Sequence, residues 1–242
     1  MPRMTPDAPS PGDDAQGVRL AKRLAALTGL SRREAELLID NGTVRVDGTV
    51  APTPQMRVRP EQRVEVEKNA QPQPVPPVTL VLHKPAGVQI APAAPLAGMR
   101  RSDTDRSGLP QLPRHLVEQR CVAALGQIDS GLVVFTQVHG IARKLIEDAG
   151  ILEHELLVEV EGVPTTEALQ AMRPARVSIG SQREGRTALR FAIKGPQPGQ
   201  VSAMCARAGL RILGVRRLRL GRVALAGMAP GEWRYLLPDE RF

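Results

Sequence analysis

The chain contains 242 residues, 42% of them hydrophobic and 24% charged, which is enough for one large domain or for a small domain joined to a medium one. It has no apolar run of about 18 residues and no apolar segment at its start, so we expect neither a membrane-spanning helix nor a signal peptide. Its two cysteines, Cys121 and Cys205, exclude a disulfide framework and a four-cysteine zinc site. We therefore expect a cytoplasmic protein that holds no metal.

The charge balance favours a polyanionic partner. Lys and Arg total 33 against 25 Asp and Glu, which gives a net charge of +8. Most of the basic residues are arginines, whose planar guanidinium suits bidentate contacts with phosphate, although a GC-rich genome explains the same bias. Aromatic residues make up only 2% of the chain, which argues against recognition of bases on an exposed stacking platform.

The chain begins with a polar stretch and a compact unit. Residues 1–17 are rich in Pro, Asp, Ser and Gly, which predicts a disordered tail. Residues 18–67 form the compact unit, and its leucines at positions 20, 24 and 27 share one helical face. Gly29 is the expected C-cap of this first helix.

A capping box predicts a second helix, with Ser31 as its N-cap and Glu34 reaching back to it. Gly42 ends this helix. Residues 44–50 alternate between apolar and polar side chains and turn at an Asp-Gly pair, which predicts a β-hairpin. Residues 63–66 end the unit as another short strand.

The next segment separates this unit from a larger one. Four prolines within residues 69–77 predict a semi-rigid linker, so we set a domain boundary at residues 68–77. Residues 78–242 mix strands and helices without strict alternation, which is typical of an α+β domain with a mainly antiparallel sheet. Within them, residues 88–120 hold few periodic signals and predict a long surface loop. The predicted strands are residues 78–82, 121–125, 131–136, 155–160, 187–193, 222–225 and 233–237, and the predicted helices are residues 141–149, 166–172 and 201–208.

Basic side chains gather on the two helices of the first unit. Arg32 and Arg33 occupy the first turn of the second helix, where the helix macrodipole disfavours cations by roughly 0.3–1 kcal/mol each. Together with Arg19, Lys22 and Arg23 they are candidates for a phosphate-binding face. An ordinary solvated face is the alternative, because this unit holds nine basic and seven acidic side chains.

Three short motifs occur in a fixed order in the first unit: Gly-Leu-Ser-Arg-Arg-Glu-Ala at residues 29–35, Gly-Thr-Val at 42–44 and Val-Asp-Gly at 46–48. With Arg-Leu-Ala-Lys at residues 19–22, they closely resemble the αL RNA-binding domain named after ribosomal protein S-four. The resemblance implies two helices and a hairpin that bind structured RNA, with the helical basic residues on phosphates.

Further motifs follow in the larger unit. Leu-His-Lys-Pro-Ala-Gly at residues 82–87 is similar to a Leu-Asn-Lys-Pro-x-Gly motif, and Gly-Gln-Ile-Asp at 126–129 to Gly-Arg-Leu-Asp. Gly-Leu-Val-Val-Phe-Thr at 131–136 is similar to Gly-Leu-Leu-Leu-Leu-Thr, and the end of the chain carries Gly-Glu-Trp-Arg at 231–234. These motifs resemble the bacterial rRNA pseudouridine synthases of the RsuA, RluB, RluE and RluF type.

The resemblance implies isomerisation of uridine to pseudouridine in structured RNA, most naturally ribosomal RNA. A target uridine is flipped out of the stack, Asp129 attacks the nucleotide, and the base is released, turned and rejoined through carbon. In the family a tyrosine packs on the base and an arginine pairs with the aspartate. No metal or organic cofactor is implied, Lys84 is an expected RNA contact, and we expect a monomer.

The supporting positions differ from that pattern. Gln127 stands where the family has an arginine two residues before Asp129, Leu156 stands at the tyrosine position, and Ser202 at the position of the arginine partner. Only one residue separates the aspartate from the Gly-Leu strand, where the family has four. Either three residues are missing after Asp129, or Gly126 fills the aspartate's position.

A basic segment, residues 203–225, contains no acidic residue, and its arginines are either further RNA contacts or a solvated basic edge. The arginines are Arg207, Arg211, Arg216, Arg217, Arg219 and Arg222. Two functions stay open from the sequence. One is an active pseudouridine synthase; the other is a catalytically degenerate relative that binds RNA without modifying it, for example in ribosome assembly.

Overall fold

The computed structural model describes residues 17–91 and 96–242, and these residues form two compact units. The first unit contains the described residues up to Pro76 together with Pro110–Glu118, and the second contains Pro77–Leu109 and Gln119–Phe242. Except for Gly17, the tail predicted over residues 1–17 lies outside the described residues.

The two helices at the start of the first unit begin and end where the sequence predicts. α1 (Leu20–Thr28) ends at Gly29, whose φ of 74° lies in the left-handed region that a glycine C-cap adopts. α2 (Arg32–Asp40) begins with the predicted capping box. The Ser31 hydroxyl accepts a hydrogen bond from the Glu34 amide (3.2 Å), and the Glu34 carboxylate accepts one from the Ser31 amide (2.8 Å).

Short strands complete the first unit. They are β1 (Val18–Arg19), which pairs with β4 (Arg57–Val58), and β2 (Val44–Val46), which lies between β3 (Thr49–Val50) and β5 (Val64–Val66). The predicted hairpin turn has positive φ at both Asp47 (49°) and Gly48 (81°), as a type I′ turn requires. The helices and β2 share one core, in which Leu20, Ile39 and Val44 are fully buried.

A segment from later in the chain also belongs to the first unit. Residues 110–118 carry α3 (Pro113–Leu116), which contacts α2. Pro113 lies against Gly42, because a Cβ added to Gly42 would be 3.0 Å from the proline ring. The prediction of a long surface loop over residues 88–120 is therefore wrong in this stretch. A helix of four residues is too short to show an apolar period in the sequence.

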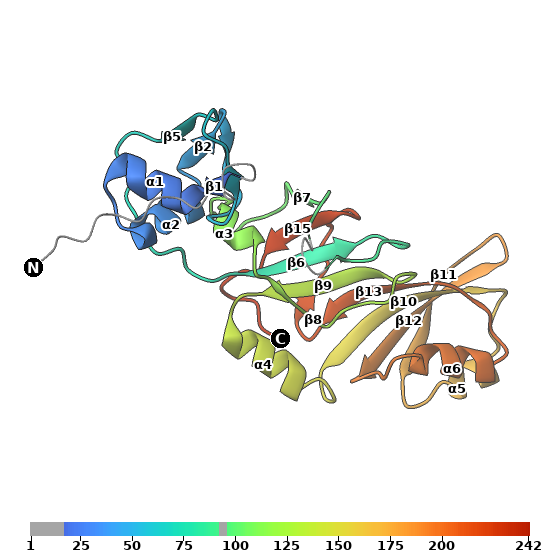
Figure 1. Cartoon of the computed structure of the whole chain (residues 1–242). Helices are drawn as coiled ribbons and strands as arrows, with labels where there is room; N and C mark the ends of the chain where they lie inside the picture. Colours follow the sequence, from blue (N-terminus) through green and yellow to red (C-terminus); the bar gives the residue numbers. More distant parts are fainter. Residues whose placement is uncertain (1–16, 92–95) are drawn as a thin grey trace, which may run out of the picture. The chain divides into compact units, whose positions relative to one another are not determined.

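The second unit is built on one large sheet, whose strands lie in the order β11-β12-β10-β13-β9-β6-β15-β7, with β14 beside β13 and β8 beside β9 (Figure 1). Among the described strands, the β13–β9 and β15–β7 pairs are parallel and the other pairs antiparallel. The predicted α+β domain with a mainly antiparallel sheet is thus confirmed. The strands are β6 (Thr79–Lys84), β7 (Arg100–Arg101), β8 (Arg120–Val122), β9 (Ser130–Thr136), β10 (Glu153–Glu161), β11 (Arg176–Arg183), β12 (Arg186–Lys194), β13 (Ile212–Leu220), β14 (Val223–Ala224) and β15 (Glu232–Tyr235).

Helices lie on one face of this sheet (Figure 1). They are α4 (His139–Glu147), α5 (Thr166–Gln170) and α6 (Gln200–Arg207). α4 packs over Leu132 and Val134 of β9, whereas α6 packs over Leu156 and Val158 of β10. Because β13 runs between β10 and β9, it lies between these two apolar clusters.

Each strand predicted for the second unit overlaps an observed strand, but the sequence does not predict the long strands β11 and β13 or the two-residue strand β7. β11 is exposed along almost its whole length. β13 carries arginines at positions 216, 217 and 219. Neither of these long strands therefore shows the apolar alternation by which a half-buried strand is recognised.

Candidate active site

Asp129, the predicted nucleophile, ends the loop between β8 and β9. Its side chain is half-buried, whereas that of the preceding Ile128 is 81% exposed. The carboxylate turns back toward Gly126, since a Cβ added to Gly126 would lie 3.1 Å from Asp129 Oδ2. The two positions that the sequence leaves open for the aspartate therefore lie next to each other in space.

Arg217 of β13 places a buried positive charge near Asp129. The side chain is 3% exposed, and it donates hydrogen bonds through Nε to the Leu132 carbonyl (2.7 Å) and through Nη2 to the Ala123 carbonyl. Burial lowers the pKa of Arg217 to about 10, and the electrostatic effects of Cys121 and Asp129 oppose this shift. The guanidinium is therefore cationic at neutral pH, and it attracts the Asp129 carboxylate.

The approach of the two strands depends on a glycine. Gly131 lies opposite Arg217 in the parallel pair of β9 and β13. Its φ is +107°, and a Cβ at this position would collide with the Arg217 backbone. Glycine thus lets β13 bring Arg217 beside the start of β9, two residues after Asp129.

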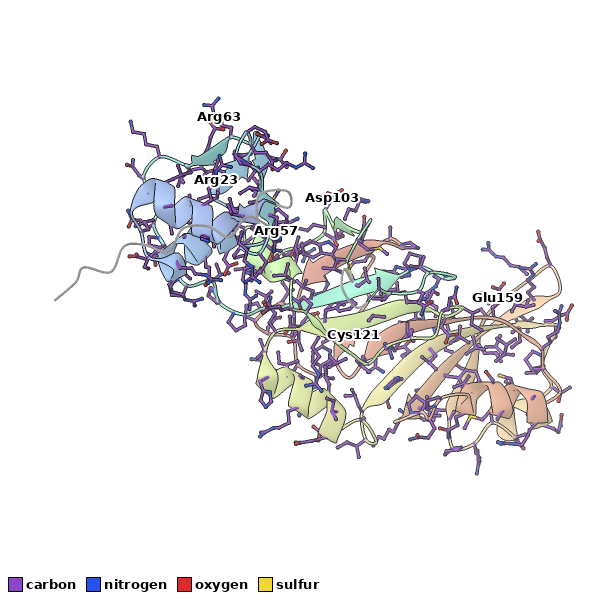
Figure 2. All side chains as sticks on the ribbon, in the orientation of Figure 1. Arg23, Arg57, Arg63, Asp103, Cys121 and Glu159 are labelled. Carbon is purple, nitrogen blue, oxygen red and sulfur yellow. The ribbon has the colours of Figure 1, made fainter. Side chains whose placement is uncertain are left out.

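Two more titratable side chains lie near Arg217. Burial, together with the Arg217 charge, lowers the pKa of His154 to about 4. Although the residue as a whole is exposed, partial desolvation of the Cys121 thiol raises its pKa, and the Arg217 charge opposes that shift. Both side chains are therefore uncharged at neutral pH. Cys121 is exposed on β8 (Figure 2).

Lys84, a predicted RNA contact, points into the protein. The residue is 1% exposed, and its ammonium donates hydrogen bonds to the carbonyls of Pro85 (3.0 Å), Gln127 (2.9 Å) and Asp129 (2.6 Å). Burial lowers its pKa, and the charge of Asp129 opposes this effect. The structure therefore places this ammonium on the backbone of the Asp129 loop, away from any surface open to a phosphate.

The residues at the other family positions lie in different environments. Leu156 is 6% exposed in the apolar cluster under α6, and it lies opposite Arg217 in the antiparallel pair of β10 and β13. Gln127 donates from Nε2 to the Gly87 carbonyl (3.3 Å). Ser202 is exposed on α6. The sequence alone assigns Arg217 only to RNA contacts, and the structure adds it to the surroundings of Asp129.

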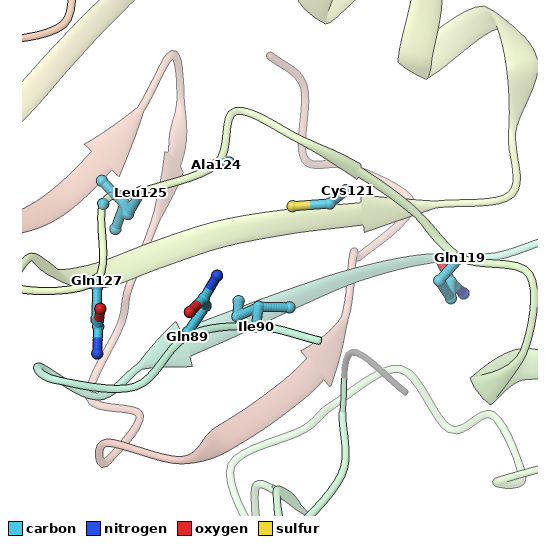
Figure 3. Close-up of a pocket in the computed structure, with 8 residues that line it drawn as sticks. Gln89, Ile90, Gln119, Cys121, Ala124, Leu125 and Gln127 are labelled. Atoms are coloured by element: carbon cyan, nitrogen blue, oxygen red, sulfur yellow. The ribbon is translucent and has the colours of Figure 1, made fainter. Parts of the chain in front are cut away.

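A pocket of about 490 Å³ lies beside the loop that ends at Asp129 (Figure 3). The segment after β6 lines it with Gln89 and Ile90, and the segment from β8 onward lines it with Cys121 and Gln127. Its described lining contains no charged side chain. Such a volume is typical of small-ligand sites, and its glutamines offer hydrogen bonds to an uncharged polar ligand.

The predicted RNA contacts of the first unit divide into two groups. Arg23 donates hydrogen bonds to the carbonyls of Pro60 (2.9 Å) and Gln62 (2.8 Å), so it fixes the loop before β5. The other four are exposed, and two of them also pair with Glu36 on α2. These four are Arg19, Lys22, Arg32 and Arg33.

The arginines of residues 203–225 do not form one surface. Arg211 pairs with Glu161, and Arg219 pairs with both Glu153 (2.8 Å) and Glu155 (3.0 Å). These glutamates belong to a row on β10 that includes Glu159, labelled in Figure 2. Arg217 is buried. The remaining members are exposed, and they are Arg207, Arg216 and Arg222.

The described part of the chain shows no cluster of His, Cys, Asp and Glu able to hold a metal ion. It also contains no helix that is both long and apolar enough to cross a membrane.

The fold and the first unit's sequence define the class of protein. Residues 18–64 match the family model of the S4 domain. The whole chain is similar in structure to a pseudouridylate synthase, with a TM-score of 0.51 and 19% identity over 91% of this chain and 96% of that one. The chain therefore combines an N-terminal S4 domain with a pseudouridylate synthase fold.

Relatives found by sequence are also RNA pseudouridine synthases. The chain is 26% identical to an uncharacterised RNA pseudouridine synthase of Aquifex aeolicus, over 92% of this chain and 94% of the relative. It is also 26% identical to the dual-specificity RNA pseudouridine synthase RluF of Escherichia coli, over 92% of this chain and 77% of that protein. The protein is a homologue of RNA pseudouridine synthases that carries an N-terminal S4 domain.

Proposed function

We propose that this protein binds structured ribosomal RNA and isomerises a uridine in it to pseudouridine, with Asp129 as the nucleophile. It acts as a cytoplasmic monomer without a metal or an organic cofactor. The observation that carries the proposal is the pairing of β13 with β9, which brings the buried Arg217 opposite Gly131, two residues after the half-buried Asp129. An ionised carboxylate in a partly dry site is costly unless a cation compensates it. Arg217 supplies this positive charge from strand β13. The family has its arginine at a helix position, which Ser202 occupies in this chain.

RNA binding is supported by the exposed cations of the S4 domain. Arg32 and Arg33 lie at the N-terminus of α2, 62% and 74% exposed at their side chains. Cations are unfavourable at this end of a helix, so a role in binding phosphate accounts for their presence. Arg19 and Lys22 add two more exposed charges on or beside α1.

The reaction needs only groups that the site contains. Uridine and pseudouridine have the same atoms, so no oxidant or co-substrate is required. After the base is flipped out, a carboxylate oxygen of Asp129 bonds to ribose C1′ as the bond from C1′ to N1 breaks, and the base is released as its anion. The base turns, C5 bonds to C1′ and displaces the Asp129 carboxylate, the C5 proton leaves to solvent, and N1 gains a proton. The positive charge of Arg217 attracts the carboxylate.

The flipped base has neutral surroundings available. The uncharged pocket beside the Asp129 loop offers the amides of Gln89 and Gln127, whereas Leu156 is buried under α6 and does not replace the family tyrosine as a contact of the base. Gln127 lacks the positive charge of the family arginine, so we expect slower release and turning of the base than in a protein with that arginine.

The test is to incubate the purified protein with unmodified rRNA transcripts and to map pseudouridine, with wild-type protein and with Asp129→Asn. The proposal predicts modification at one or a few uridines by the wild type and its loss in the variant. The substitution keeps the size of the side chain but removes its nucleophilic charge.

Two results would contradict the proposal. Modification that persists in Asp129→Asn would show that another group is the nucleophile. Retention of RNA with no modification of any transcript would instead establish the degenerate, RNA-binding function.

A further inference from the structure

Lys84, at the end of β6, connects two loops beside the proposed nucleophile. Its buried ammonium donates to the carbonyls of Pro85, Gln127 and Asp129, at 3.0, 2.9 and 2.6 Å. A lysine ammonium has three N–H donors, so these bonds use all of them. The side chain is therefore committed to the backbone and has no donor left for another ligand.

A second pair of hydrogen bonds joins the same two loops. The Gly87 amide donates to the Gln127 carbonyl (2.9 Å), and Gln127 Nε2 donates to the Gly87 carbonyl (3.3 Å). The turn at residues 84–87 and the segment at residues 127–129 are thus held together from both sides. The bond from the Lys84 ammonium extends this connection to the backbone of Asp129 itself.

We propose that Lys84 is a positioning residue for the reaction: its buried ammonium fixes the backbone of residues 127–129 and holds the Asp129 carboxylate in place for attack. This inference rests on the proposed function, since it concerns the same site. The loop offers a reason for such an anchor. A single residue, Ser130, separates Asp129 from Gly131, and Gly131 is itself fixed against Arg217.

The charge of Lys84 acts on the carboxylate as well. Lys84 of β6 and Arg217 of β13 each interact electrostatically with Asp129. Cys121 of β8 and His154 of β10 lie near Arg217 and are uncharged at neutral pH. Removal of Lys84 therefore takes away a positive charge that attracts the carboxylate, as well as the backbone anchor.

The experiment compares wild type, Lys84→Met and Lys84→Arg in single-turnover pseudouridine formation at saturating RNA. Lys144→Met is the matched control, because Lys144 is an exposed lysine of α4 that pairs with Asp148. RNA affinity and melting temperature are measured for each protein.

We expect the rate in Lys84→Met to fall by about 100-fold, the cost of a nucleophile misplaced by about 1 Å. RNA affinity should stay within about twofold of wild type because the ammonium does not face solvent. Lys84→Arg keeps the charge and should recover part of the rate, and Lys144→Met should match wild type.

Three results would overturn the inference. RNA affinity that falls while the single-turnover rate holds would make Lys84 an RNA contact. Full activity in Lys84→Met would show that Lys84 has no role in the reaction. A rate lost equally in Lys84→Met and Lys84→Arg, in step with melting temperature, would show that Lys84 only stabilises the fold.

Failure of the proposed function gives a different pattern. If wild-type protein modifies no transcript, that proposal fails, and hydrogen exchange then tests the anchor by itself. Faster exchange at residues 126–130 in Lys84→Met than in Lys144→Met supports the anchor. Equal exchange in both variants contradicts it.

Discussion

Three arginines close together in β13 have three different roles, and their surroundings decide which. Arg216 is exposed, Arg217 is buried with its donors on the carbonyls of Leu132 and Ala123, and Arg219 forms ion pairs with β10 glutamates. A sequence motif finds Asp129, but the partner charge arrives through the parallel pairing of β13 with β9. No spacing along the chain contains that pairing, so the role of Arg217 could not be predicted.

Arg217→Met is expected to lower both stability and activity. It leaves the carbonyls of Leu132 and Ala123 without their donor, which costs about 1–3 kcal/mol, and it removes a positive charge near Asp129. Urea denaturation measures the first effect, and the single-turnover rate at saturating RNA measures the second. The control is Arg143→Met, an exposed position on α4. A single-turnover rate in Arg217→Met equal to that of the wild type would show that Arg217 has no role in the reaction.

His154 should make the protein less stable in mild acid. Burial holds the pKa of His154 at about 4 in the folded protein, against 6.5 for a free histidine. Between these values the unfolded chain binds a proton that the folded protein does not, so stability falls as pH drops from 6.5 toward 4. Melting temperatures across this range should decline less in His154→Gln than in wild type. An identical decline in His154→Gln, or an equal gain in the exposed control His139→Gln, would contradict the assignment.

At the scale of elements, the junction of β9 and β13 is the sensitive point of the site. Gly131→Ala should be strongly destabilising and inactive, because φ at this position is +107° and a Cβ meets the Arg217 backbone. Gly140→Ala is the matched control, since Gly140 lies in α4 with open space at its Cβ. This control should gain roughly 0.5–1 kcal/mol. Folding and activity in Gly131→Ala equal to wild type would mean that β9 and β13 do not need this close approach.

Local signals predict most elements of the chain, and long-range contacts account for the ones missed. The Ser31–Glu34 capping box and the Asp47-Gly48 turn are formed by neighbouring residues, so the sequence shows them directly. β13 is identified as a strand only by its pairing with β10 and β9. α3 is stable as part of the first unit because it packs on α2, which lies far from it in the chain.

At the scale of the whole molecule, the net charge of +8 favours a polyanion but does not say where it binds. Many of the arginines are paired within the protein, and β10 in particular is flanked by arginines that neutralise its glutamates. Fewer positive charges are therefore available to bind RNA than the total number of arginines implies. The exposed cations of the S4 domain are the ones we expect to meet phosphate.

RNA affinity should fall steeply between about 50 and 200 mM salt, as expected for several phosphate contacts. Arg32→Ala and Arg33→Ala should each reduce the slope of log K against log salt by about one or less. Filter binding with a structured rRNA fragment measures these slopes, with Arg143→Ala as control. If the RNA affinity of the wild-type protein does not change with salt concentration, binding of RNA through phosphate contacts is contradicted.

The most direct test of the central claim follows the hydrogen that the reaction must displace. RNA labelled with tritium at C5 of uridine is incubated under single-turnover conditions with wild-type protein, Asp129→Asn and Arg217→Met. Our account predicts tritium release by the wild type, none by Asp129→Asn, and slower release by Arg217→Met. Release of tritium by Asp129→Asn at the wild-type rate would contradict it.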